Sequence, residues 1–141
     1  MPDDEKIEIR FVEEWNTSEI IELYRQGNWW KEEWDKMGIL PLISGSFLFA
    51  VAYSVRQNKA VGMGRVISDG VSDGYIQDLV ILKDYRGKGL GKTVLKSLVD
   101  ESVKRGLSWI GLIAEPDTED FYRMEGFEIM NGHTPMIYTR W

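Results

Sequence analysis

The fold of this chain is decided by one stretch, Asp84-Tyr85-Arg86-Gly87-Lys88-Gly89-Leu90-Gly91-Lys92-Thr93. Its three glycines stand at alternate positions, between an apolar run and an amphipathic run. Glycine allows a tight turn and lets a ligand approach main-chain N–H groups without a Cβ in the way. The first N–H groups of a helix are unpaired, and the helix dipole makes that end positive, which suits phosphate. The stretch predicts an anion-binding turn with Arg86, Lys88 and Lys92 as cationic donors; a solvated turn without a ligand is the alternative.

Two nucleotide-binding signatures can be compared with this stretch. The Walker A motif ends as Gly91-Lys92-Thr93 does, but Arg86 stands where its first glycine belongs. The dinucleotide fingerprint could begin at Gly87, but Lys92 stands where its third glycine belongs. Both spacings fail, so nucleotide hydrolysis is only a third hypothesis.

The residues outside the turn predict an α/β (α+β) fold, a mixed β-sheet with flanking helices on both faces, in one domain over 1–141. Asn16 and Glu19 form a capping-box pattern at a helix start. Apolar periodicity predicts helices over 16–27, 28–38, 89–104 and 116–126, with a loop around Pro41 and Gly45. It predicts strands over 7–12, 47–55, 61–67, 75–82 and 109–114, and two short last strands over 127–130 and 136–138.

Composition excludes several classes of function. The 141 residues include no cysteine, which excludes disulfides, thiolate metal sites and a Cys nucleophile. One histidine cannot build a His-based metal cluster or a Ser-His-Asp triad, and we expect no metal. The net charge of −6, from 17 basic and 23 acidic side chains, argues against nucleic acid or membrane partners and suits a cationic small molecule. With no apolar run of about 18–20 residues and an acidic start, we expect a cytoplasmic protein.

Two motifs resemble one family. The segment Arg86-x-x-Gly89-x-Gly91 matches the Gln/Arg-x-x-Gly-x-Gly/Ala signature of the GNAT superfamily of acetyl-CoA-dependent N-acetyltransferases. About 35 residues on, Phe121-Tyr122 with Glu125-Gly126-Phe127 is similar to the Phe-Tyr-x-x-x-Gly-Phe segment of the same family. The expected order of elements agrees with the GNAT fold over nearly the full length.

The resemblance implies an acetyl-CoA site on one strand and the turn that follows it. In GNAT proteins the strand backbone pairs with the pantetheine arm, and main-chain N–H groups of the turn hold the pyrophosphate. The strands at 75–82 and 109–114 are expected to splay apart where the arm lies. The positions that match are Leu79, Val80, Ile81, Arg86, Gly87, Lys88, Gly89, Leu90, Gly91 and Lys92.

The resemblance also implies groups for the chemistry. A backbone N–H, that of Ile81 here, polarises the thioester carbonyl. The tyrosine that matches Tyr122 lies near the sulfur and can protonate the departing thiolate, because a phenol with a pKa of about 10 is protonated at neutral pH. Packing beside Phe121 is the alternative role of Tyr122.

Two carboxylates are candidates for the general base. Asp78 precedes the pantetheine segment, and strand alternation predicts that its side chain points opposite to those of Gln77 and Leu79. A carboxylate that only holds a neighbouring segment in place is the alternative. Glu115 stands where many family members carry an Asn that contacts CoA, so it is a second candidate for the base or for binding the substrate ammonium.

The acceptor is the least specified part of the reaction. Trp29 and Trp30 belong to the region that covers the acceptor pocket in GNAT proteins, so they are candidate substrate-binding residues, with core packing as the alternative. We expect acetyl transfer to a small primary amine by direct attack in a ternary complex. A protein N-terminus or lysine is an alternative acceptor, and a non-catalytic CoA sensor is an alternative class. A homodimer is left open, because family members are often dimers.

Overall fold

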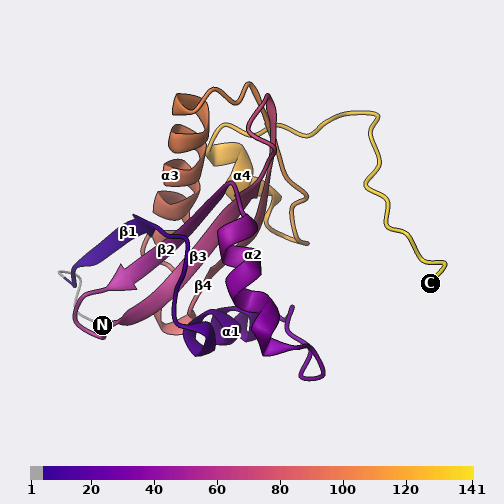
Figure 1. Cartoon of the computed structure of the whole chain (residues 1–141). Helices are drawn as coiled ribbons and strands as arrows, with labels where there is room; N and C mark the ends of the chain where they lie inside the picture. Colours follow the sequence, from indigo (N-terminus) through magenta and orange to yellow (C-terminus); the bar gives the residue numbers. More distant parts are fainter. Residues whose placement is uncertain (1–4) are drawn as a thin grey trace. The chain divides into compact units, whose positions relative to one another are not determined.

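The computed structural model describes residues 5–141 (Figure 1). The chain separates into two units, Met1–Gly111 and Leu112–Trp141. The first unit contains the strands β1 (Ile7–Phe11), β2 (Leu48–Ser54), β3 (Lys59–Ile67), β4 (Asp73–Ile81) and β5 (Trp109–Gly111). Its helices are α1 (Thr17–Gln26), α2 (Ile39–Gly45) and α3 (Leu90–Lys104), with 3₁₀ turns η1 (Lys36–Gly38) and η2 (Lys83–Tyr85). The second unit contains α4 (Glu119–Met124).

The five strands form one mixed sheet in the order β1-β2-β3-β4-β5. Neighbours from β1 to β4 are antiparallel, whereas β5 is parallel to β4 and is reached through α3. A parallel neighbour requires such a crossover connection. The glycine-rich turn at residues 86–91 therefore lies between the carboxyl end of β4 and the beginning of α3.

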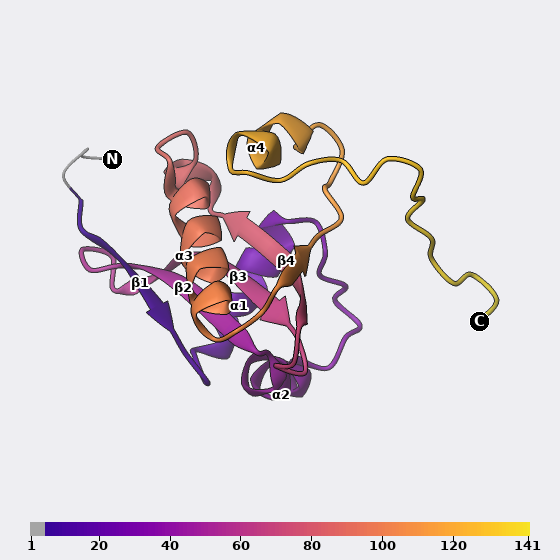
Figure 2. The same ribbon diagram turned by 90° about the horizontal axis from the view of Figure 1, so that it is seen from above.

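Helices cover both faces of the sheet (Figure 2). On one face, Ile20, Leu23 and other apolar residues of α1 pack with Ile43 of α2 against Phe49 and Met63 of the sheet. On the other face lies α3, which buries Val94, Leu95 and Leu98. The predicted fold class, a mixed sheet with helices on both faces, is confirmed.

The start of α1 follows the capping pattern only in part. The Asn16 side chain accepts a hydrogen bond from the backbone N–H of Glu19 at 3.0 Å, as an N-cap does. The Glu19 side chain does not complete the box. Its Oε1 accepts instead from Trp15 Nε1 at 3.0 Å and from the backbone N–H of Ala60 at 2.6 Å, so it joins α1 to β3.

One predicted helix, two predicted strands and the loop predicted around Pro41 and Gly45 are wrong. The helix predicted over 28–38 lies further along the chain, at Ile39–Gly45, and includes Pro41. Proline is tolerated in the first turn of a helix because the N–H that it lacks has no partner there. The two strands predicted at 127–130 and 136–138 are also wrong, since residues 125–141 contain no strand. Alternation makes a segment compatible with a strand, but a strand also needs a neighbour to pair with.

None of the helices formed by residues 5–141 is both long enough and apolar enough to cross a membrane.

Candidate active site

The glycine-rich turn has a backbone that only glycine adopts easily. Gly87 and Gly89 have φ values of 77° and 79°, in the left-handed region, and a Cβ at either position would meet nothing within 4 Å. Glycine is therefore required here by backbone conformation, and the space beside the main chain is left open. Gly89 is the N-cap of α3 and makes no side-chain capping bond. The first N–H groups of this 15-residue helix therefore lie beside an open turn. An anion site needs such unpaired N–H groups with open space next to them.

Arg86 ties the turn to the rest of the first unit. Its Nε donates to the carbonyl oxygen of Ile81 at 2.8 Å, and Nη2 donates to the carbonyl oxygen of Gln26 at 3.5 Å. The Gln26 side chain in turn accepts from the backbone N–H of Lys83 at 3.3 Å. The guanidinium thus holds the turn against the end of β4 and the end of α1. Direct contact of Arg86 with a pyrophosphate stays a prediction.

The end of β4 exposes one side of its backbone. The N–H of Leu82 donates to the carbonyl oxygen of Val61 in β3 at 2.8 Å. Backbone groups alternate in direction along a strand, so the N–H of Ile81 points away from β3. The pairing of β4 with β5 comprises only Asp73–Tyr75 of β4, so Ile81 lies beyond it. The pairing of β4 with β5 therefore ends well before Ile81. The expected splay and the role of the Ile81 N–H stay predictions.

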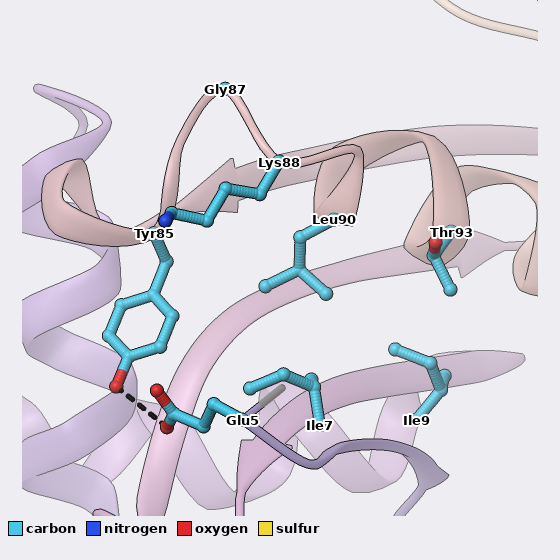
Figure 3. A pocket seen from close by; sticks show the side chains of 8 residues that line it. All are labelled: Glu5, Ile7, Ile9, Tyr85, Gly87, Lys88, Leu90 and Thr93. Atoms are coloured by element: carbon cyan, nitrogen blue, oxygen red, sulfur yellow. Dashed lines mark hydrogen bonds between the residues drawn. The ribbon is translucent and has the colours of Figure 1, made fainter. Parts of the chain in front are cut away.

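A cavity of about 510 Å³ borders the turn (Figure 3). Gly87, Lys88, Leu90 and Thr93 line it from the turn and α3, and Ile7 and Ile9 line it from β1. At one end, the Tyr85 hydroxyl donates to Glu5 Oε1 at 3.0 Å, which is the dashed line in Figure 3. Burial raises the pKa of Tyr85, so the hydroxyl remains a donor at neutral pH. The turn is thus accessible on the side that faces β1.

Asp78 occupies an irregular position in β4. Its φ is 60°, and its Oδ2 accepts from the Tyr24 hydroxyl at 2.8 Å and from Arg65 Nε at 2.6 Å. Arg65 stands opposite Gln77 in the register, so Gln77 and Asp78 both lie on the α1 face of the sheet. The prediction that Asp78 points opposite to Gln77 is therefore wrong, because a bulge interrupts the alternation. A base role for Asp78 stays a prediction.

Tyr24 and Arg65 are site residues that the sequence analysis missed. Tyr24 is 6% exposed. Burial and the neighbouring Asp78 charge raise the pKa of its phenol well above its usual range, so it stays a proton donor in that bond. A buried tyrosine hydroxyl needs a partner, but no local pattern indicates a partner 54 positions away.

The second unit carries Tyr122 and Glu115. Tyr122 lies in α4, with ring centroids 5.0 Å from Phe121 and 5.9 Å from Phe127. Burial, and to a smaller extent the charge of Glu115, raises the pKa of Tyr122. Glu115 is exposed, and its carbonyl oxygen accepts from the Thr118 N–H at 3.1 Å at the start of α4. The phenol is therefore held protonated at neutral pH, as an acid must be.

Trp29 and Trp30 both pack partly buried against the core of the first unit. The ring of Trp29 meets Tyr24 edge-on at 6.4 Å, and that of Trp30 meets Trp34 at 5.7 Å. A Cβ at Gly27 would lie 2.6 Å from the Trp29 ring, so the glycine allows the indole to fold back on α1. These contacts show core packing for both indoles, and their role in binding an acceptor stays a prediction.

Known acetyltransferases are similar to this chain. The model of the "Acetyltransferase (GNAT) family" matches residues 9–127. An uncharacterized N-acetyltransferase ycf52 of Porphyra purpurea is 33% identical over 128 residues, covering 87% of this chain and 74% of that protein. The chain spans 64% of the Pyropia yezoensis protein of the same name. A rice protein named serotonin N-acetyltransferase 2, chloroplastic, is 38% identical over 69 residues, covering 49% of this chain and 34% of that protein.

A solved structure has the same fold over nearly the whole chain. It is a GNAT family acetyltransferase, SP0256, of Streptococcus pneumoniae, with 26% identity and a TM-score of 0.76 over 95% of this chain and 98% of that one. One conclusion follows from four observations. These are the signature at Arg86–Gly91, the left-handed glycines before α3, the short pairing of β4 with β5, and the family match over 9–127. The chain belongs to the acetyltransferase (GNAT) family.

Proposed function

We propose that this chain transfers the acetyl group of acetyl-CoA to the primary amine of a small molecule by direct attack in a ternary complex. The observation that carries the proposal is the turn at Gly87 and Gly89, left-handed at both glycines and placed between the open end of β4 and the start of α3. Its main-chain N–H groups suit the pyrophosphate of CoA, and the family match supports acetyl-CoA as the donor.

The chemical step needs three groups. The neutral amine nitrogen attacks the thioester carbonyl, whose oxygen gains negative charge that the Ile81 N–H stabilises. The C–S bond then breaks, and the thiolate takes a proton from the phenol of Tyr122. A cationic amine first loses one proton to a carboxylate or to water, with Asp78 and Glu115 as the candidates. The second proton, lost by the nitrogen after attack, restores the phenol of Tyr122.

The acceptor is proposed to be a cationic amine that carries an apolar body. The net charge of −6 favours the approach of a cation. The partly buried indoles of Trp29 and Trp30 next to α1 supply apolar surface, and the rice relative bears the name of an enzyme for an arylalkylamine. Arylalkylamines are therefore the first acceptors to test, followed by polyamines and peptides.

The test of the donor site is a thermal-shift titration with acetyl-CoA. A ligand that binds only the folded protein raises its melting temperature by mass action. Gly89→Val places a β-branched side chain at φ 79° and in the open space beside the turn, so the shift should be lost. The control is Gly106→Val, with a similar strained φ of 101° and open space, at the opposite end of the same helix. A full acetyl-CoA shift in Gly89→Val would overturn the pyrophosphate assignment.

A further inference from the structure

Three side chains from three elements meet at one carboxylate oxygen. Tyr24 of α1 and Arg65 of β3 both donate to Oδ2 of Asp78 in β4. The Arg65 and Asp78 side chains are 16% and 18% exposed, and Tyr24 is nearly fully buried. An ion pair removed this far from water is screened weakly and holds its partners in one geometry. We call Tyr24, Arg65 and Asp78 the Asp78 cluster.

The cluster lies at a bulge in β4. Met63 of β3 stands opposite Val80 and Arg65 stands opposite Gln77, so that Gly64 alone faces both Asp78 and Leu79. A residue with a Cβ persists in the left-handed conformation of Asp78 only where its surroundings enforce it. Aspartate tolerates this conformation better than most residues, and the two hydrogen bonds fix its side chain.

The other face of the bulge is held by packing. A Cβ on Gly64 would lie 3.3 Å from Leu79 Cδ1 and 2.9 Å from Leu98 Cδ1. Leu79 therefore fits between β3 and α3 because residue 64 has no side chain. Asp78 is held by contacts on the α1 face of the sheet and Leu79 by contacts on the α3 face. The backbone of the bulge is therefore fixed from both faces.

A bulge bends a strand and redirects the residues that follow it. This bulge consists of Asp78 and Leu79, and Val80 and Ile81 follow it. Leu79, Val80 and Ile81 are the segment assigned to the pantetheine arm and the thioester. The donors from Arg65 and Tyr24 both occupy Oδ2 of Asp78 and join β4 to β3 and to α1. This geometry is that of a group that positions its neighbours.

We propose that Tyr24, Arg65 and Asp78 act as positioning residues, fixing the bulge of β4 and thereby aiming the backbone of Leu79–Ile81 at the thioester. This inference rests on the proposed function, and it assigns the general base to Glu115 or to water. The conservative variant Asp78→Asn keeps two acceptor sites on an oxygen and tolerates the left-handed backbone. Asp78→Gly keeps the backbone freedom but removes the anchor for Tyr24 and Arg65.

The experiment measures kcat, the KM for acetyl-CoA and the pH profile of these two variants. Positioning predicts that kcat falls by about 10²-fold in Asp78→Gly, the effect of a small misplacement of reacting groups. It predicts a loss of less than about tenfold in Asp78→Asn, with the acidic limb of the profile unchanged. A general base would behave differently. An equal loss of about 10²–10⁴-fold in both variants, with the acidic limb removed, would overturn the inference.

A second measurement needs no activity. Amide hydrogen exchange across residues 78–82, in the protein without ligand, reports directly whether the bulge is held. Tyr24→Phe, which removes one of the two donors and keeps the ring, should speed that exchange. The control is Tyr53→Phe, whose hydroxyl donates to Asn58 in the β2–β3 connection. Unchanged exchange in Tyr24→Phe and Asp78→Gly would overturn the inference. If the wild-type chain transferred no acetyl group, the proposed function would fail, and exchange would still decide whether the cluster fixes the bulge.

Discussion

At the scale of single residues, Tyr122 is the side chain whose proposed role is most chemical. It lies in α4 against the rings of Phe121 and Phe127, so its ring also has a packing role. Tyr122→Phe separates the two roles, because it keeps the ring and removes the only proton that the side chain can donate. We expect kcat in single-turnover measurements to fall by about 10²–10⁴-fold, the range typical of general acids. The melting temperature and the affinity for acetyl-CoA should barely change. An unchanged single-turnover rate would return Tyr122 to a packing role.

The pH dependence of Tyr122 follows from the direction of its pKa shift. Burial and the Glu115 charge raise its pKa above the ordinary value of 10.0. An acid with a raised pKa in the folded protein stays protonated up to a higher pH, so its proton is lost only as the pH rises through that raised value. No fall in kcat around pH 8–10 should therefore come from Tyr122. A fall in kcat in that pH range that is abolished in Tyr122→Phe would contradict the raised pKa of Tyr122.

The sequence predicts the glycine-rich turn, but it does not predict the contacts of the Asp78 cluster. The signature from Arg86 to Gly91 is local, and its conformation follows from glycines at fixed spacing. The partners of Asp78 are not local, because Tyr24 comes from a helix 54 positions earlier in the chain. Strict alternation also placed Asp78 opposite to Gln77, and a bulge reverses that relation. No period-two pattern in β4 indicates where the extra residue lies.

At the scale of elements, the contact of α3 with the sheet depends on a glycine in β3. Gly64→Ala would place a Cβ 2.9 Å from Leu98 and 3.3 Å from both Leu79 and Val94. Leu98 and Val94 are fully buried, so they have little room to move aside. We expect the free energy of unfolding to fall by about 1–3 kcal/mol, as for other overpacked cores, in urea denaturation.

Gly38→Ala is the control for that substitution. Gly38 has no unusual φ, and a Cβ there would meet nothing within 4 Å. Its unfolding free energy should stay within about 1 kcal/mol of the wild type. Equal stability of the two variants would mean that α3 does not pack on β3 as closely as the structure shows.

The elements that periodicity predicts well are those with strong local signals. The strands β1 to β4 and the helices α1 and α3 lie close to the predicted ranges. The segment 28–38 was predicted as a helix from its aromatic spacing, but Trp29 and Trp30 are held by packing on the core, and the helix follows at Ile39–Gly45. The strands predicted after Phe127 needed a partner that local sequence does not provide.

At the scale of the whole molecule, the sequence carries an excess of negative charge. The net charge of −6 should favour a cationic acceptor through long-range attraction, which salt screens. We expect kcat/KM for a cationic arylalkylamine to fall as the salt concentration rises from about 0.01 M to 0.5 M. An aromatic amine that is neutral at the same pH serves as the control and should change less. Equal salt dependence for both acceptors would contradict the role of charge in capture.

The proposed transfer of an acetyl group from CoA to a small amine can be measured in one assay. Acetyl-CoA is mixed with arylalkylamines, polyamines, amino sugars, amino acids and peptides, and the released CoA thiol and the N-acetylated product are both quantified. We expect equal amounts of thiol and N-acetyl product for a small amine, with neither formed by Gly89→Val. Binding of acetyl-CoA without thiol release above background for any acceptor would contradict it and identify a CoA sensor. Transfer to peptides alone would contradict the small-molecule acceptor.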